Sequence, residues 1–246
     1  MQPFDTLRQY RTPYGMIAHI TSGDLTLDFT GTTTDPLNAD GLDGSVQADT
    51  PTSLPLAAVV GYALPQNIPL HMTGHFVHVG NLWQVTQGKG VIKGNSFSLP
   101  LAELNEGAHA QPDHVKADIA FDQLNMNSLL VKGEQAGTAN QADLPLAISL
   151  TPDPLIEARF MARTVRYNIY NFQNFSVLAS VTPGLVNMPE LRVGYLGSAL
   201  VASGQLQAVG KGNAHLQARA AVTGADIETY RRARGFQPVP LQGRVT

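Results

Sequence analysis

Apolar and polar residues alternate strictly in segment after segment of this chain, and this pattern constrains the fold more than any other feature. In the segment 24–29, Asp, Thr and Asp alternate with Leu, Leu and Phe. The same pattern returns at 114–122, 156–160, 174–181 and 215–222. A period of two residues is typical of a β-strand that buries one face and exposes the other. The sequence therefore predicts a chain built mainly of half-buried strands.

Helical signals are short and few. A segment at 54–64 begins and ends near prolines, and the segment 122–130 has Asp122 as a candidate N-cap. The segment 226–234 has acidic residues first, arginines last and Gly235 as its stop, an order that suits the helix dipole. Helices this short cannot cover the apolar faces of so many strands. Those faces must meet a second sheet, close into a barrel, or line a groove that a ligand fills.

The composition excludes several classes of protein. Only 14% of the residues are charged, against about 25% in an average soluble domain. A net charge of −3 with 16 Lys and Arg does not suit a nucleic-acid binder, which needs a concentrated basic face. The chain has no cysteine, which excludes disulfides, a thiol nucleophile and any zinc site that uses cysteine.

The length of 246 residues fits one large domain or two small ones. We expect residues 1–20 to be an N-terminal lead-in and residues 21–246 to form a single β-rich region. The first residues lack the apolar stretch of a signal peptide, and we find no apolar run of the ~20 residues that a membrane helix needs. The chain is thus expected to be cytosolic or a fragment without its targeting element.

Several segments resemble the AsmA family of bacterial envelope proteins. In that family a strand leads to an apolar helix, then to a Leu-Pro…Pro element and a strand that contains glycine. The stretch 42–99 resembles this order, with Leu64, Pro65, Pro69 and Gly74 at the matching places. The segments 117–130, 158–208 and 238–245 resemble later strands and turns of the family.

The resemblance implies a mainly β fold, in which a curved antiparallel sheet with a few short helices forms an open groove facing the periplasm. It implies a non-enzymatic role in outer-membrane biogenesis, with phospholipid or other acyl chains carried between the inner and outer membranes. The expected partners are these lipids, envelope proteins and the inner membrane, and no cofactor or nucleic acid is expected. Since the family's N-terminal membrane helix is absent, we expect an internal piece of a larger, membrane-anchored periplasmic protein.

Within this hypothesis, the apolar members of the alternating segments are the candidate lining of the groove. These residues are Leu25, Leu27, Phe29, Val115, Ile119, Phe121, Ile156, Phe160, Phe175 and Val177. Two alternatives stay open. The same residues could pack against each other in a closed β-sandwich, as in a binding or adhesion module of the envelope. A β-rich hydrolase is the other alternative, and it would need two carboxyl groups that converge in a cleft.

Other motifs have ordinary explanations. His71 and His75 fall on one side of a predicted strand and His78 on the other, so that the three cannot share one metal ion. We expect all three to be surface residues. The arginines of the segment 226–234 suit a phosphate headgroup, although a solvated helix end is the simpler interpretation. No GxSxG or HExxH motif occurs, and we expect neither a catalytic residue nor a metal site.

Overall fold

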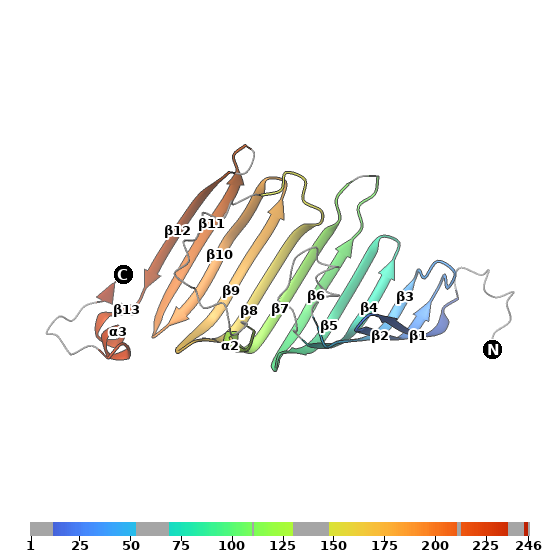
Figure 1. Ribbon diagram of the computed structural model, residues 1–246, viewed down its shortest axis with the longest axis horizontal. Coiled ribbons are helices and arrows are strands. Elements are labelled where there is room, and N and C mark those ends of the chain that lie inside the picture. The colour runs from blue at the N-terminus through green and yellow to red at the C-terminus, as the bar shows by residue number, and fades with distance from the viewer. Residues whose placement is uncertain are drawn as a thin grey trace. The chain divides into compact units, whose positions relative to one another are not determined.

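The protein is described here by a computed structural model that covers residues 12–52, 69–109, 111–129, 148–210, 213–235 and 244–245 (Figure 1). The described residues fold mainly as long antiparallel strands, with two short helices. The hydrogen-bonded order of the long strands is the chain order, from β1 to β12. The prediction of a mainly β chain is therefore confirmed. The predicted helix at 54–64 lies outside the described residues.

Contacts within the chain divide it into two units. Unit 1 comprises Met1–Ala120 and Ser128–Val131, and unit 2 comprises Phe121–Asn127 and Lys132–Thr246. Strand β7 passes through this boundary, so that its first part belongs to unit 1 and its last part to unit 2.

Among its described residues, unit 1 contains six complete strands and the beginning of the seventh. They are β1 (Tyr14–Ser22), β2 (Leu25–Thr33), β3 (Leu42–Thr50), β4 (Leu70–Val79), β5 (Leu82–Ile92), β6 (Asn95–Asn105) and the first part of β7 (His114–Asn125). Neighbouring strands from β1 to β6 pair antiparallel. The strand β1 begins at Tyr14, inside the segment for which the sequence predicts only a lead-in.

Unit 2 contains the end of β7 and the remaining strands. They are β8 (Leu155–Tyr167), β9 (Tyr170–Thr182), β10 (Leu185–Tyr195), β11 (Ser198–Ala208), β12 (Ala214–Thr223), β13 (Ala225–Asp226) and β14 (Arg244–Val245). Neighbouring strands from β8 to β12 pair antiparallel, and β13 pairs only with β14.

Tight turns explain why some strands pair with the next one in the chain. The turns Lys93–Gly94 and Leu196–Gly197 each have two residues with positive φ, and each separates two strands. Two-residue turns of this kind match the right-handed twist of the strands they join. The turn at Lys93–Gly94 divides the stretch 91–99 between β5 and β6.

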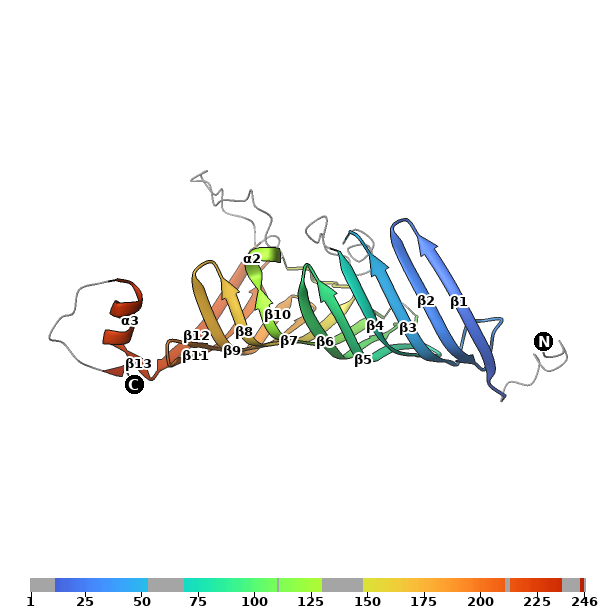
Figure 2. The same ribbon diagram turned by 90° about the horizontal axis from the view of Figure 1, so that it is seen from below.

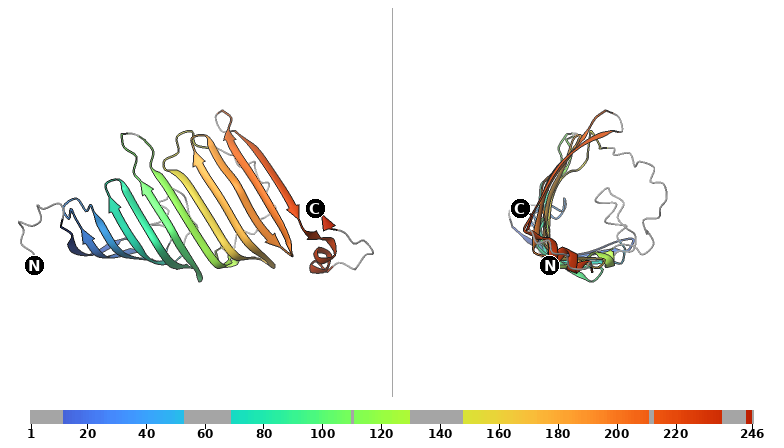
Figure 3. Two further views of the ribbon diagram at one scale, coloured as in Figure 1. Left: turned by 180° about the vertical axis from the view of Figure 1, so that it is seen from behind. Right: turned by 90° about the vertical axis from the view of Figure 1, so that its left-hand side faces the viewer.

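The sheet in each unit is open and curved. The strands bend along their length (Figures 2 and 3), and β1 and β12 each pair with only one described strand. The only other described sheet is the pair β13–β14, with two residues in each strand. Since a sandwich needs two packed sheets, the prediction of an open, curved antiparallel sheet is confirmed and the closed β-sandwich is wrong.

The two helices lie at the ends of strands. Helix α2 (Met126–Leu129) follows β7 directly, so the prediction of Asp122 as a helix cap is wrong: Asp122 lies within β7. Helix α3 (Ile227–Ala233) confirms the predicted helix, with Asp226 as its N-cap and Arg234 as its C-cap. None of the described helices has the length and apolar character to span a membrane.

Candidate functional site

Strand register in unit 1 sorts the side chains onto two faces of different chemistry. Residues that lie directly opposite each other in paired strands point to the same face. Phe29 lies opposite both Ala18 and Val46, and the register carries this face on through Gly74, opposite Val46. We call it the apolar face of unit 1, and its larger apolar members are Tyr14, Met16, Ile20, Leu25, Leu27, Phe29, Leu42, Val46, Leu70, Met72, Phe76, Trp83, Val85, Ile92, Phe97, Leu99 and Leu104.

Charged residues are missing from this face. None of the paired positions of β1 to β6 on the apolar face holds Asp, Glu, Lys or Arg. The rings of Phe29 and Phe76 meet edge to face with centroids 6.0 Å apart, and Phe76 lies 6.1 Å from Trp83. Three strands, β2, β4 and β5, thus contribute to one row of aromatic rings.

Glycines let these rings lie flat on the sheet. Gly31 and Gly44 are opposite each other, and the Phe29 ring covers both. A Cβ atom at Gly31 would come 2.8 Å from the Phe29 ring and 2.3 Å from the Asp43 carbonyl oxygen. Gly90 has the same relation to Phe97, whose ring would lie 2.6 Å from a Cβ atom there. The glycines therefore have a packing role on this face.

Unit 2 repeats the division into two faces with different residues. Phe160 lies opposite Val177, and Val177 lies opposite Leu191 on the other side. We call this the apolar face of unit 2, and its larger apolar members are Ile156, Phe160, Val165, Tyr167, Tyr170, Phe172, Phe175, Val177, Val181, Val186, Met188, Leu191, Val193, Tyr195, Leu200, Leu206, Leu216 and Val222. The paired positions of β8 to β12 that belong to this face hold no Asp, Glu, Lys or Arg.

The candidate lining residues fall on these faces as follows. Leu25, Leu27 and Phe29 lie on the apolar face of unit 1, and only Phe29 is fully buried, with 8% of its surface exposed. Ile156, Phe160, Phe175 and Val177 lie on the apolar face of unit 2 and are half-buried. On β7, Val115 and Ile119 are half-buried and Phe121 is buried. The Phe121 ring lies 5.3 Å from that of Phe160, which in turn lies 5.7 Å from Phe175.

Part of both apolar faces is open to solvent. Ile20 in unit 1 is 55% exposed, and Leu216 in unit 2 is 64% exposed. Exposing this much apolar surface is unfavourable, by about 25 cal/mol per Å². A continuous apolar surface with no charged residue is typical of an interaction site rather than of an ordinary solvated surface.

The opposite face of unit 1, its polar face, carries histidine–aspartate pairs. His19 Nδ1 lies 2.6 Å from Asp28 Oδ1, its direct neighbour across the strands. His71 Nδ1 lies 2.5 Å from Asp49 Oδ1, also directly opposite. The hydrogen bond from His71, followed by one from Gln47, lowers the pKa of Asp49 below its usual value.

The prediction of three surface histidines is only partly correct. His71 and His75 are exposed on the polar face, where His75 Nε2 lies 3.1 Å from Asp43. His78 is buried, with 7% of its surface exposed, and lies on the apolar face. The sequence predicted His78 at the surface because the alternation within a strand does not show which loop will cover the end of that strand.

A polar cluster surrounds the buried His78 at one end of the apolar face of unit 1. The His78 ring stacks on Trp83 at 3.6 Å, and its two nitrogens each lie 2.9 Å from a carbonyl oxygen, of Ala39 and Gly80. The Asp40 carboxylate accepts hydrogen bonds from the backbone N–H groups of Gly41 and Gly80. These two bonds, that from Gly80 first, lower the pKa of Asp40. The cluster fixes the β2–β3 loop against the β4–β5 turn.

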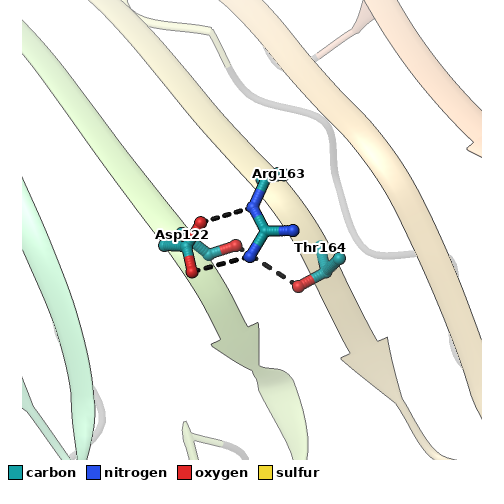
Figure 4. Close-up of polar contacts among 3 residues, drawn as sticks. All are labelled: Asp122, Arg163 and Thr164. Atoms are coloured by element: carbon teal, nitrogen blue, oxygen red, sulfur yellow. Dashed lines mark hydrogen bonds and ion pairs between the residues drawn. The ribbon is translucent and has the colours of Figure 1, made fainter.

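The polar face of unit 2 holds arginine–carboxylate pairs. Both Nε and Nη2 of Arg163 on β8 donate to the carboxylate of Asp122 on β7, the latter at 2.8 Å (Figure 4). The Thr164 hydroxyl donates to the Asp122 backbone carbonyl at 3.3 Å. The Arg163 hydrogen bonds lower the pKa of Asp122. Arg192 pairs in the same bidentate way with Glu190, and its hydrogen bonds lower the pKa of Glu190.

An aromatic cluster at one end of unit 2 was not predicted. Tyr195 has ring centroids of three other residues within reach, Phe172 at 5.4 Å, Tyr170 at 5.9 Å and Tyr230 at 5.4 Å. These residues come from β9, β10 and α3, so no local sequence pattern connects them. We call Tyr170, Phe172, Tyr195 and Tyr230 the aromatic cluster.

The described residues contain no group of three or more His, Asp or Glu side chains placed to hold a metal ion. Searches against protein-family models, curated proteins and solved structures found no match to this chain. The two faces of the sheet and the resemblance to the AsmA family are therefore the basis for a functional proposal.

Proposed function

We propose that this chain is a non-enzymatic protein of the bacterial envelope whose apolar sheet faces line a groove for phospholipid acyl chains. One observation carries the proposal: on the described strands, the apolar face of each unit holds no charged residue, although it stays partly open to solvent. An acyl chain placed along such a face would gain about 25 cal/mol for each Å² of apolar surface removed from water.

The shape of the apolar faces favours a flexible occupant. Large rings such as Phe160 stand beside small residues such as Ala158 and Ala162 on one strand, which leaves an uneven surface. A rigid protein partner would need a surface of complementary shape, whereas an acyl chain adapts its torsions to the surface. Acyl chains need no hydrogen bonds, and these strands already pair their backbone groups with each other.

The resemblance to the AsmA family supplies the cellular setting. A protein of this kind would stand in the periplasm, anchored to the inner membrane, and would hold or conduct phospholipid toward the outer membrane. The polar faces suit an aqueous compartment because they carry the charged residues of the strands, some of them in pairs such as Asp122–Arg163.

Native mass spectrometry of the purified chain, combined with lipid analysis of an organic extract, tests the proposal. We expect bound phospholipid in a defined ratio, either as purified or after incubation with phospholipid vesicles. A chain that stays lipid-free after both treatments would overturn the proposal.

Matched variants on one strand link the lipid to the apolar face. Phe160→Asp places a carboxylate on the apolar face of β8, and its neighbour Arg159→Asp places one on the polar face. We expect loss of lipid only from the first. If Phe160→Asp does not fold, Leu216→Asp replaces it, since the Leu216 side chain is exposed and tolerates a carboxylate. Equal lipid content in the apolar-face variant and Arg159→Asp would contradict the proposal.

A further inference from the structure

The turn between β8 and β9 lies beside helix α3 at one end of unit 2. Tyr170, at the start of β9, has its ring centroid 5.9 Å from that of Tyr195, and Tyr195 meets Tyr230 of the helix at 5.4 Å. The Arg234 guanidinium, at the end of the helix, lies 5.6 Å from the centre of the Tyr170 ring. The turn and the helix therefore form one contiguous surface. We call residues 166–170 and 225–234 the tip of unit 2.

Large apolar side chains at the tip are open to solvent. Ile169, in the turn itself, is 77% exposed, and Tyr167 is 47% exposed. Ile227 and Tyr230 on α3 are exposed as well. Turns ordinarily carry glycine or polar residues, and a group of exposed apolar side chains marks an interaction site. The tip thus exposes more apolar surface than a solvated turn and helix end require.

An open apolar pocket of about 450 Å³ lies at the helix side of the tip. It is lined by Ala225, Asp226, Ile227, Tyr230, Arg231 and Arg234, and apolar atoms form most of its surface. Tyr230 belongs both to this pocket and to the aromatic cluster, where it contacts Tyr195 of the apolar face. The apolar surface of the tip therefore continues into the apolar face of unit 2.

The tip also has an excess of positive formal charge. Its sequence holds four arginines and two carboxylates, namely Arg166, Arg231, Arg232, Arg234, Asp226 and Glu228. The whole chain, in contrast, has a net charge of −3. A positive excess beside exposed apolar and tyrosine side chains is typical of a surface that meets an anionic lipid bilayer.

The size of the tip favours a bilayer over a protein partner. The tip has 15 residues, whereas a stable protein–protein interface uses about 20–30 residues on each side. A bilayer needs no complementary shape and accepts a few apolar side chains at a time. Its anionic lipids attract the summed charge of the tip over a distance, so that no single arginine has to hold a headgroup.

We propose that the tip of unit 2 docks on the surface of an anionic phospholipid bilayer. Ile169 and Ile227 enter the apolar layer, and Tyr167 and Tyr230 lie at the level of the headgroups. Tyrosine suits this boundary because its ring is apolar and its hydroxyl is polar. The inference goes beyond the proposed function, since docking at the tip does not require lipid on the apolar faces of the sheet.

A fluorescent label at the turn tests the docking directly, because the chain has no cysteine of its own. Ile169→Cys carries a nitrobenzoxadiazole dye and is mixed with vesicles of phosphatidylglycerol or of phosphatidylcholine. The matched control is Ile17→Cys with the same dye, since Ile17 in unit 1 is 85% exposed and lies outside the tip. We expect brighter, blue-shifted emission from position 169 on phosphatidylglycerol, and none from position 17. No change at 169, equal changes at both positions, or an equal response to both lipids would overturn the proposal.

Vesicle co-sedimentation of unlabelled variants measures how much the turn contributes. Ile169→Asp is compared with Ile17→Asp, which makes the same change of charge at another exposed isoleucine. We expect Ile169→Asp to bind phosphatidylglycerol vesicles about tenfold more weakly, which corresponds to about 1.4 kcal/mol. Ile17→Asp should bind as the unmodified chain does. If Ile169→Asp does not fold, Ile169→Asn replaces it, because asparagine suits turns. Equal binding by the variants at 169 and 17 would overturn the docking surface.

The lipid content of the chain separates this inference from the proposed function. Ile169→Asp should retain as much bound lipid as the unmodified chain, because Ile169 lies in the turn and outside the paired strands. A chain that sediments with vesicles but holds no lipid once separated from them would overturn the proposed function and leave the docking intact. A chain that holds lipid but does not sediment with vesicles would overturn the docking alone.

Discussion

The two faces of the same strands carry different kinds of side chains and differ in how they meet solvent. On the polar faces, polar and charged partners contact each other across neighbouring strands, as His71 and Asp49 do in unit 1 and Arg163 and Asp122 do in unit 2. On the apolar faces, Asp, Glu, Lys and Arg are missing from every paired position of β1 to β6 and of β8 to β12. One face is thus satisfied by solvent and by cross-strand pairs, whereas the other needs an apolar cover.

The difference also shows which residues hold the fold. The exposed charge pairs each contribute little, since solvent and salt screen them. The rings on the apolar faces bury large areas and contact rings on neighbouring strands, as Phe160 does with Phe121 and Phe175. Stability should therefore depend on the apolar face, and substitutions on the two faces of one strand should differ strongly.

Replacing Phe29 should produce the largest difference in stability between substitutions on the two faces. Phe29 is 8% exposed, contacts Phe76 edge to face and covers two glycines. We expect Phe29→Ala to lower the free energy of unfolding by about 3 kcal/mol. Its neighbour Asp28 is exposed on the polar face, so Asp28→Ala should cost no more than about 0.5 kcal/mol. Urea denaturation measures both, and similar losses would contradict the assignment of the faces.

A glycine-to-alanine substitution, which adds a single methyl group, should give a smaller difference in stability between the two faces. A Cβ atom at Gly31 would meet the Asp43 carbonyl oxygen and the Phe29 ring, whereas one at Gly15 would find no atom within 4 Å. We expect Gly31→Ala to destabilise the chain by about 1–3 kcal/mol through overpacking. Gly15→Ala should be neutral or slightly stabilising, because alanine has less freedom to lose on folding. Thermal unfolding followed by circular dichroism compares them, and a Gly31→Ala variant as stable as Gly15→Ala would show that the ring does not cover this position.

The alternation in the sequence predicted the faces well where strands are regular. Leu25, Leu27 and Phe29 share a face because nothing interrupts the period of two in β2. The pattern fails where the backbone adds a residue. Gln87 and Asn174 have positive φ, and the two faces exchange places along the strand at these positions. Such a bulge leaves no reliable trace in the pattern of apolar residues.

Strand ends, and clusters of residues from distant segments, could not be predicted from the sequence. The strand β1 was not predicted because its pattern of alternation is interrupted at Ile17. This large apolar residue lies on the polar face, where it is 85% exposed. The aromatic cluster joins Tyr170, Tyr195 and Tyr230, which are far apart in the chain. Only the order of strands brings these rings together. The helix itself was predicted because capping by Asp226 is a local signal.

The smallest expected effect concerns the polar face, where the Arg163 guanidinium holds the pKa of Asp122 below its usual value of 3.8 (Figure 4). Because the folded state releases this proton more readily than the unfolded chain, the pair stabilises the fold above pH 3.8. This contribution is lost as the pH falls through the lowered pKa. In Arg163→Gln, we expect the pKa of Asp122 to return toward 3.8 and this part of the acid sensitivity to disappear.

Carboxyl-carbon NMR titration of Asp122 measures this change directly, and Asp49 provides an internal control. The pKa of Asp49 is lowered by His71 and Gln47 in unit 1, so Arg163→Gln should leave it unchanged. The same variant should also retain its bound lipid, since Arg163 lies on the polar face. An unchanged Asp122 titration would show that the ion pair does not persist in solution. Loss of lipid from Arg163→Gln would contradict the separate roles of the two faces, because lipid binding on the apolar face would then depend on a charge of the polar face.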